Sequence, residues 1–85
     1  MFLYTFFDKK QSCYLAPFAM SNRGAAVRAF MDMVNRPNDD SLIFRYPDDF
    51  DLYELASFDA ESGDLLDWQR KEFICNGRSL KADDS

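Results

Sequence analysis

The sequence has no histidine, and its 85 residues include three glycines, three prolines and two cysteines. Without histidine, the commonest general base and the Ser-His and Cys-His nucleophile pairs are excluded. Three widely spaced glycines leave no glycine-rich loop that could hold a phosphate group. Cys13 and Cys75 lie far apart in no metal-like spacing, which favours free thiols over a disulfide framework. We therefore expect a protein that is not an enzyme and that holds no metal or cofactor.

Two acidic stretches are also unlike catalytic or metal sites. The carboxylates of "PDDFD", Asp48, Asp49 and Asp51, are adjacent in a turn, where such groups are usually solvated or cap a helix. The stretch "DAESGD" faintly resembles a calcium loop, but its glycine is fifth rather than sixth. Arg70 also takes the place of the closing glutamate, so we interpret this stretch as a hairpin turn.

A long hydrophobic run is missing too. The N-terminal "MFLYTFFDKK" is apolar but too short to span a membrane, and no positive region precedes it. We interpret it as a strand, and expect a cytoplasmic protein with no membrane partner. Aromatic residues make up 16% of the chain, enough to build one small core. We expect one domain over residues 1–78, a flexible acidic tail over 79–85, and a homodimer as a natural way to cover a spare aromatic face.

Charge is divided unevenly along the chain. The formal net charge is −5. Residues 1–36 carry five basic and two acidic side chains, a net of +3, and residues 37–85 carry five basic and thirteen acidic ones, a net of −8. The overall balance argues against nucleic-acid binding, which depends on clustered positive charge, but the first half could still supply a local basic patch.

The pattern of apolar residues predicts two strands and then a helix. Residues 2–7 and 11–16 are rich in aromatic types and predict an antiparallel hairpin that ends at Pro17. Ser21 or Asn22 is expected to cap the following helix, which Pro37 stops. The helical period assigns five residues to its buried face: Ala26, Ala29, Phe30, Met33 and Val34.

The second half predicts a turn-rich segment and further strands. Residues 41–50 are expected to be extended or turned, and "DLYELASFD" alternates as a strand, with Leu52 on one side and Tyr53 on the other. Gly63 supplies a left-handed residue for the next turn, and residues 65–75 fit either a strand or a short helix. The order ββαββ predicts an α+β fold: a small antiparallel sheet with one amphipathic helix packed on one face. The other face is then left to water or to a partner.

Two binding functions compete at this point. Aromatic and basic side chains share the N-terminal half, a mixture typical of proteins that bind single-stranded nucleic acid, and the candidate contacts are Lys9, Lys10, Arg23, Arg28, Tyr4 and Tyr14. Alternatively, the aromatics form the core, the lysines decorate a turn, and the spare sheet face binds a protein.

Arg28 is the one charged residue within a largely apolar helical stretch. The 3.6-residue period places it away from the buried face, where it could pair with Asp32 four residues on. Its guanidinium could also reach an acidic group such as Asp49 while its stem covers aromatic rings. A structural role and a contact with phosphate or a partner both stay open.

Several short motifs follow one another along most of the chain: an N-terminal aromatic strand ending in Asp8, "APF" at 16–18, "AVRAF" at 26–30, "YPDDFDLYEL" at 46–55, "SFDAESGDL" at 57–65 and, more loosely, "FICNG" at 73–77. Their order and spacing resemble the small nonstructural protein, the fifth open reading frame, of gokushoviruses, which are single-stranded DNA phages of the Microviridae. The segment 66–73 departs from that pattern because it is charged where a proline-containing stretch is expected.

The resemblance implies a nonstructural accessory protein without enzymatic activity. Such a protein would act in the host cytoplasm, outside the virion, when phage replication turns to making single-stranded genomes. Its partner would be a phage or host replication protein, or single-stranded DNA itself. The alternative is a small dimeric interaction module that modulates a host protein without touching nucleic acid.

Overall fold

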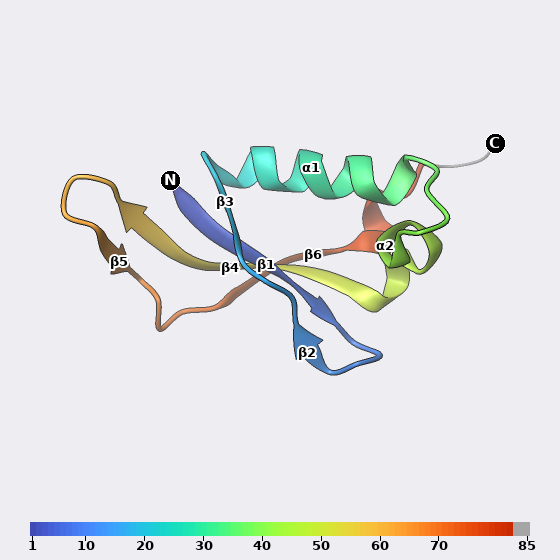
Figure 1. Ribbon diagram of the computed structural model, residues 1–85, viewed down its shortest axis with the longest axis horizontal. Helices are drawn as coiled ribbons and strands as arrows, with labels where there is room; N and C mark the ends of the chain where they lie inside the picture. Colours follow the sequence, from blue (N-terminus) through green and yellow to red (C-terminus); the bar gives the residue numbers. More distant parts are fainter. Residues whose placement is uncertain (83–85) are drawn as a thin grey trace.

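One antiparallel sheet and one long helix make up most of the molecule. The computed structural model describes residues 1–82. Helix α1 crosses one face of a six-stranded sheet, and the other face is left open (Figure 1). The elements are β1 (Phe2–Asp8), β2 (Cys13–Tyr14), β3 (Phe18–Met20), α1 (Arg23–Asn35), α2 (Leu42–Arg45), the 3₁₀ turn η1 (Pro47–Asp49), β4 (Phe50–Asp59), β5 (Asp64–Leu66), β6 (Glu72–Asn76) and the 3₁₀ turn η2 (Gly77–Leu80).

The two longest strands, β1 and β4, pair with each other at the centre of the sheet. On its outer side β1 pairs with β2 near one end and with β3 near the other. In the same way, β4 pairs with β5 and with β6. The α+β class is therefore confirmed, but the simple ββαββ order is not, because each outer strand is divided into two short pieces.

Local chemistry explains these divisions. Pro17, which has no N–H to donate, lies between β2 and β3, so the predicted strand 11–16 is shortened and pairing resumes at Phe18. In the turn after β1, the Asp8 carboxylate accepts backbone hydrogen bonds from Lys10 and Gln11, at 3.0 and 3.2 Å. Gly63 has φ 78° in the turn after β4, as the predicted hairpin requires.

Helix α1 confirms most of its sequence pattern. The Asn22 side chain caps it by accepting a hydrogen bond of 2.8 Å from the Ala25 N–H. Ala26, Phe30 and Val34 are buried against the sheet, and the helix ends before Pro37. Met33 was wrongly expected on this face, since it is 44% exposed. Ala29 was also expected there but is only half-buried, and it lines a groove with Arg28. The buried face is narrower because a single helix meets a twisted sheet along one line of residues.

One segment differs from its predicted conformation, and the structure settles the conformation of another that the sequence left open. Residues 42–45, expected to be extended or turned, form the short helix α2, capped by the Ser41 hydroxyl, which accepts from the Phe44 N–H at 3.2 Å. The ambiguous segment 65–75 contains the end of β5 and most of β6, joined by an exposed loop in which Asp67 has φ 57°. It is therefore extended rather than helical.

The core lies between α1 and the central strands. Its main members are Tyr4, Phe6, Phe30, Val34, Ile43, Phe50 and Leu52. The Phe6 and Phe30 rings lie 4.7 Å apart between centroids, which joins β1 to α1. None of the helices within residues 1–82 has both the length and the apolar character needed to cross a membrane.

The C-terminal segment is attached to α1. The Asn35 side chain donates to the Leu80 carbonyl at 2.9 Å and accepts from the Ala82 N–H at 2.7 Å. Residues 79–82, the start of the segment expected to be a flexible acidic tail, therefore lie against the helix. The rest of that segment, residues 83–85, lies outside the described residues.

Both cysteines are free thiols, as predicted. Cys13 is exposed on β2, and Cys75 is half-buried on β6. Burial, and then the nearby Asp51 carboxylate, raise the pKa of the Cys75 thiol. A raised pKa leaves little of the reactive thiolate at neutral pH.

Candidate functional site

The face of the sheet opposite α1 carries a row of four aromatic rings. They come from four strands: Phe7 of β1, Tyr14 of β2, Tyr53 of β4 and Phe73 of β6. Phe7 is the direct cross-strand partner of Tyr14, and Tyr53 that of Phe73, so each pair points to one side of the sheet. We call these four residues the aromatic strip.

The rings of the aromatic strip form a continuous series. Their centroids are separated by 4.6 Å from Phe7 to Tyr14, 5.7 Å from Tyr14 to Tyr53 and 5.7 Å from Tyr53 to Phe73. Tyr14 is 43% exposed and Phe73 is 53% exposed. The other two rings are half-buried. A ligand approaching this face would therefore meet aromatic surface that no element of residues 1–82 covers completely.

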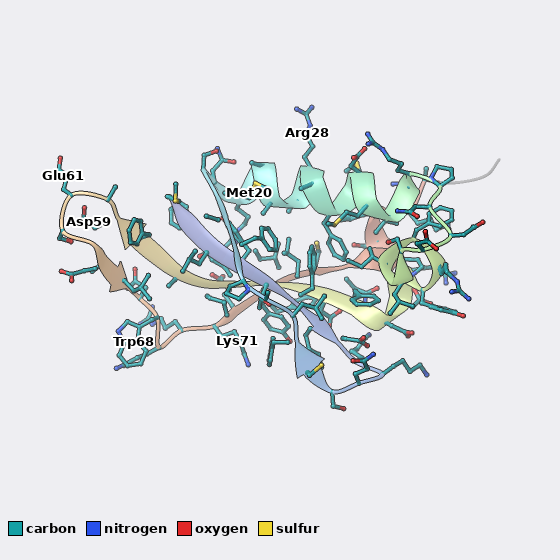
Figure 2. All side chains as sticks on the ribbon, in the orientation of Figure 1. Met20, Arg28, Asp59, Glu61, Trp68 and Lys71 are labelled. Carbon is teal, nitrogen blue, oxygen red and sulfur yellow. The ribbon has the colours of Figure 1, made fainter. Side chains whose placement is uncertain are left out.

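A lysine lies over the middle of the strip. Lys71 Nζ is 4.2 Å from the centroid of the Tyr14 ring and 5.5 Å from that of Tyr53, and it donates a hydrogen bond to the Tyr14 hydroxyl. Figure 2 shows Lys71 and Trp68 on the opposite side of the sheet from Arg28. No carboxylate of residues 1–82 lies within 4.0 Å of Lys71 Nζ. The strip therefore combines flat π-faces with an ammonium group that no carboxylate of the described chain neutralises.

One end of the strip is also charged. Lys9 Nζ lies 4.0 Å from the Asp51 carboxylate. Asp51 on β4 is the cross-strand partner of Phe7 on β1. Asp51 is largely buried and accepts a hydrogen bond of 2.8 Å from the Asn76 amide. Lys9 itself is 48% exposed, so it can exchange this long pairing for another anion.

The strip offers binding chemistry. Exposed aromatic rings and a cation recognise flat, electron-rich or anionic groups, although neighbouring rings of the strip are tilted or edge-on to each other, at 49° and 72°. Within residues 1–82, no three His, Cys, Asp or Glu side chains gather in a way that could hold a metal ion.

Comparison with known proteins gives the chain a family. Residues 1–80 match the family described as phage ORF5 protein. The chain belongs to the phage ORF5 protein family. It is 35% identical to protein ORF5 of Chlamydia phage 1 over 65 residues, which cover 74% of this chain and 68% of that protein. No solved structure matches the chain. The resemblance to a gokushovirus ORF5 protein is thereby confirmed, and the molecule is a bacteriophage protein.

The six side chains predicted as contacts in this ORF5 protein do not form one surface. Tyr14 belongs to the aromatic strip and Lys9 lies at its end, whereas Lys10 lies in the turn beyond. Arg23 is held by two carboxylates, at 3.5 Å from Glu54 and 2.8 Å from Glu72. These ion pairs make Arg23 a structural link between α1 and strands β4 and β6.

Tyr4 is fully buried, so no ligand can reach its ring. Its hydroxyl has no hydrogen-bond partner among the described residues. Burial, and then the negative charge of Glu54, raise its pKa above the ordinary value. The tyrosine is part of the core, and its ring lies 6.0 Å from that of Phe18 between centroids.

This burial predicts a pH effect on stability. A raised pKa means that, above pH about 10, the folded state binds more protons than the unfolded state, so stability falls as pH rises through the folded pKa. The Tyr4→Phe variant should lose this part of the pH dependence and match or exceed the original stability at pH 7, because an unpartnered buried hydroxyl is removed. Urea unfolding at neutral and alkaline pH measures both effects. If the difference in stability between Tyr4→Phe and the original protein stays constant from neutral to alkaline pH, the raised pKa of Tyr4 is contradicted.

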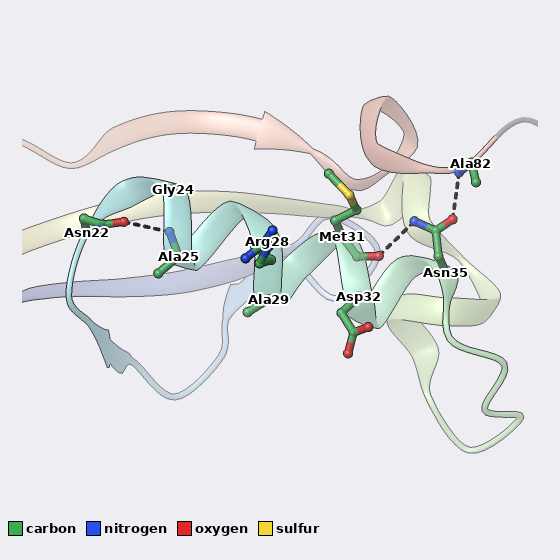
Figure 3. A pocket seen from close by; sticks show the side chains of 9 residues that line it. All are labelled: Asn22, Gly24, Ala25, Arg28, Ala29, Met31, Asp32, Asn35 and Ala82. Carbon is green, nitrogen blue, oxygen red and sulfur yellow. Dashed lines mark hydrogen bonds between the residues drawn. The ribbon is translucent and has the colours of Figure 1, made fainter.

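Arg28 lies on the outer face of α1, away from the sheet (Figure 2). It lines a shallow groove with Ala25, Ala29 and Asp32, and the Asn35–Ala82 hydrogen bond closes one end (Figure 3). Both expected ion pairs are absent within residues 1–82: Asp32 pairs with Arg36 at 3.1 Å, and Asp49 pairs with no cation. Arg28 is therefore a solvated cation on the face opposite the aromatic strip.

Four members of the site were not among the predicted contacts: Phe7, Tyr53, Phe73 and Lys71. The alternation along β4 placed Tyr53 opposite to the buried Leu52, which was the available signal. Phe73 and Lys71 lie in or beside the segment whose conformation the sequence left ambiguous. Their position depends on the pairing of β6 with β4, which no local pattern specifies.

Proposed function

We propose that this protein binds single-stranded DNA through the aromatic strip, and that it acts by binding rather than by catalysis. The observation that supports this is the series of four rings, two of which, Tyr14 and Tyr53, lie beneath the Lys71 ammonium group. Bases of a single strand are free to stack on exposed rings, and each such contact is worth about 1–3 kcal/mol. In a duplex, each base stacks on the neighbouring base pairs, which covers its π-faces, so the strip favours single strands.

The few charges at the strip predict that electrostatic attraction contributes little to DNA binding. Lys71 and Lys9 are the cations at the strip, and Asp51 opposes one of them. Each phosphate contact by a cation adds about 0.7 to the slope of log affinity against log salt for single strands. With two such cations, the expected slope is small, about −1 to −1.5.

An oligonucleotide titration with matched variants tests the proposal. Tyr14→Ala combined with Phe73→Ala should weaken binding of a fluorescent oligothymidine at least tenfold, because two exposed rings are lost. Phe73→Tyr, which keeps a ring, should bind as the original protein does. Lys71→Ala should weaken binding several-fold, whereas Arg28→Ala removes the same charge on the opposite face and should have little effect. No binding at low salt, or equal losses in the two cation variants, would reject the aromatic strip as the DNA contact.

In the phage, this binding would serve replication. We propose that the protein is an accessory factor for single-stranded genome synthesis that acts in the host cytoplasm and outside the virion; its membership of the phage ORF5 protein family supports a role in the phage. A protein that holds single strands could keep new genomes from re-pairing before they are packaged. Recruitment of a phage or host replication protein is compatible with the same role.

A second candidate is a protein-interaction module, and the end of the β4–β5 hairpin favours it. Leu65, Leu66 and Trp68 are 46%, 49% and 62% exposed. Asp64 and Asp67 are adjacent to them in the chain, Glu61 precedes Leu65 by four residues, and Arg70 follows Trp68 by two. An exposed apolar group with an acidic border suits a basic protein partner or a second copy of this chain better than it suits DNA. Light scattering on the sample used for the titration separates the two functions. A dimer that binds no oligonucleotide would favour the interaction module.

A further inference from the structure

A second region of the molecule, beyond the Lys9 end of the aromatic strip, forms two adjoining cavities. The larger, of about 630 Å³, lies where the turn after β1, the α2–η1 segment and the C-terminal residues meet. The smaller, of about 330 Å³, is lined by Leu42 and Phe50. Lys10, Tyr46 and Asp49 line both cavities and so form their shared wall.

The larger cavity gathers an unusual share of the positive charge. Four of the ten Lys and Arg side chains pair with carboxylates of residues 1–82, namely Lys9, Arg23, Arg36 and Arg78, which leaves six that do not. Three of those six, Lys10, Arg45 and Lys81, line this one cavity. In a chain of net charge −5, such a cluster gives an anion a local attraction that the rest of the surface lacks.

The acidic residues of the cavity do not cancel this charge. Asp48 is paired with Arg78 at 3.1 Å, which leaves Asp49 against the three other cations. The four cations and two carboxylates that line the larger cavity give it a net charge of +2. The smaller cavity adds the Asp8 carboxylate and no further cation, so the net charge of the two together is +1.

Tyr46 adds a surface for a flat ring. Its side chain is 47% exposed, and the Arg45 guanidinium carbon lies 5.2 Å from the centre of its ring. The ring stands at the boundary between the cationic cavity and the one lined by Leu42 and Phe50. An anionic group and an apolar flat group could therefore be bound side by side, one in each cavity.

We propose that these two cavities bind a nucleoside phosphate. The phosphate lies among Lys10, Arg45 and Lys81, and the base lies on Tyr46 above Leu42, with the Asp49 carboxylate able to accept a base N–H. The ligand is either a free nucleotide or the phosphorylated end of a DNA strand, since both present the same group. This site is separate from the aromatic strip and does not depend on the function proposed for it.

Titration of the ¹⁵N-labelled full chain with deoxyadenosine monophosphate, followed by NMR at low salt, tests the proposal. Saturable shifts are expected at residues 42–49 and at Lys81, and not at Tyr53 or Phe73. Deoxyadenosine and inorganic phosphate, each lacking half of the ligand, should bind at least tenfold more weakly. If an oligonucleotide with a 5′-phosphate binds these cavities more tightly than the same oligonucleotide with a 5′-hydroxyl, the ligand is the end of a DNA strand. If both oligonucleotides bind equally weakly, the ligand is the free nucleotide.

Matched variants make the test specific. Arg45→Ala combined with Lys81→Ala should lower the affinity about tenfold or more, because two phosphate contacts are lost. Arg28→Ala combined with Arg70→Ala removes the same charge elsewhere and should change the affinity less than twofold. Phe73→Ala, which damages the aromatic strip, should leave nucleotide binding intact. The proposal is overturned if no shift saturates, if deoxyadenosine binds as well as the monophosphate, or if both double variants lose affinity equally.

Discussion

The Phe30→Ala variant is expected to lose about 3–5 kcal/mol of its free energy of unfolding. Phe30 is fully buried in the middle of α1, and its ring contacts Phe6 of β1. The truncation leaves a cavity at the point where α1 meets the central strand β1. Domains of this size have stabilities of about 4–13 kcal/mol, so the loss would be a large fraction of the total.

Met33 provides the control for this prediction. It lies on the same helix and was also expected to face the sheet, but it is 44% exposed. Met33→Ala should change stability by less than about 1 kcal/mol, because little apolar area returns to water and alanine favours the helix. Chemical unfolding of the two variants measures the difference. Similar losses in both would mean that α1 sits on the sheet with another face.

Gly77→Ala is the second substitution with a large expected effect, about 3 kcal/mol of destabilisation. A Cβ at this position would lie 2.4 Å from the Pro47 carbonyl oxygen and 3.1 Å from Cζ of Phe30. The closest atom belongs to the backbone of η1, which cannot rotate away as a side chain could. The η1 and η2 turns would have to separate, and the Phe30 ring would have to shift as well.

Gly24→Ala is the matched control for Gly77→Ala. Near the start of α1, a Cβ on Gly24 meets only the Asn22 side chain, at 3.4 Å. This variant should be as stable as the original or more stable, by up to about 1 kcal/mol, since alanine loses less backbone entropy in a helix. In thermal unfolding, the Tm of Gly77→Ala should therefore fall, and the Tm of Gly24→Ala should stay the same or rise. A Gly77→Ala protein as stable as Gly24→Ala would contradict the close packing of η1 against η2.

The helix and the central strands could be predicted because their signals are local. Asn22 as a cap, Pro37 as a stop, and the spacing of Ala26, Phe30 and Val34 are properties of a short stretch of chain. Met33 was misassigned because the helical period gives the direction of a side chain but not the width of the surface that covers it. That width depends on the sheet, which is built from distant residues.

The site was less predictable for a related reason. Tyr14 was identified from its own hairpin, whereas Tyr53, Phe73 and Lys71 reach it through pairings between distant segments. Tyr4 was chosen on residue type, although its side of β1 faces the helix. Aromatic side chains along a strand alternate between the two faces of the sheet. Residue type alone does not tell which of them are buried until it is known which face the helix covers.

The division of both outer strands has a consequence for self-association. The segments at the two borders of the sheet, β2, β3, β5 and β6, contain two, three, three and five residues. An uninterrupted border would offer a ladder of unpaired backbone groups on which another copy could extend the sheet, the first step towards a fibril. Here each border is broken midway, at Pro17 on one side and at the Asp67–Lys71 loop on the other. The fold can thus expose aromatic rings on its open face while giving an incoming strand little backbone on which to grow.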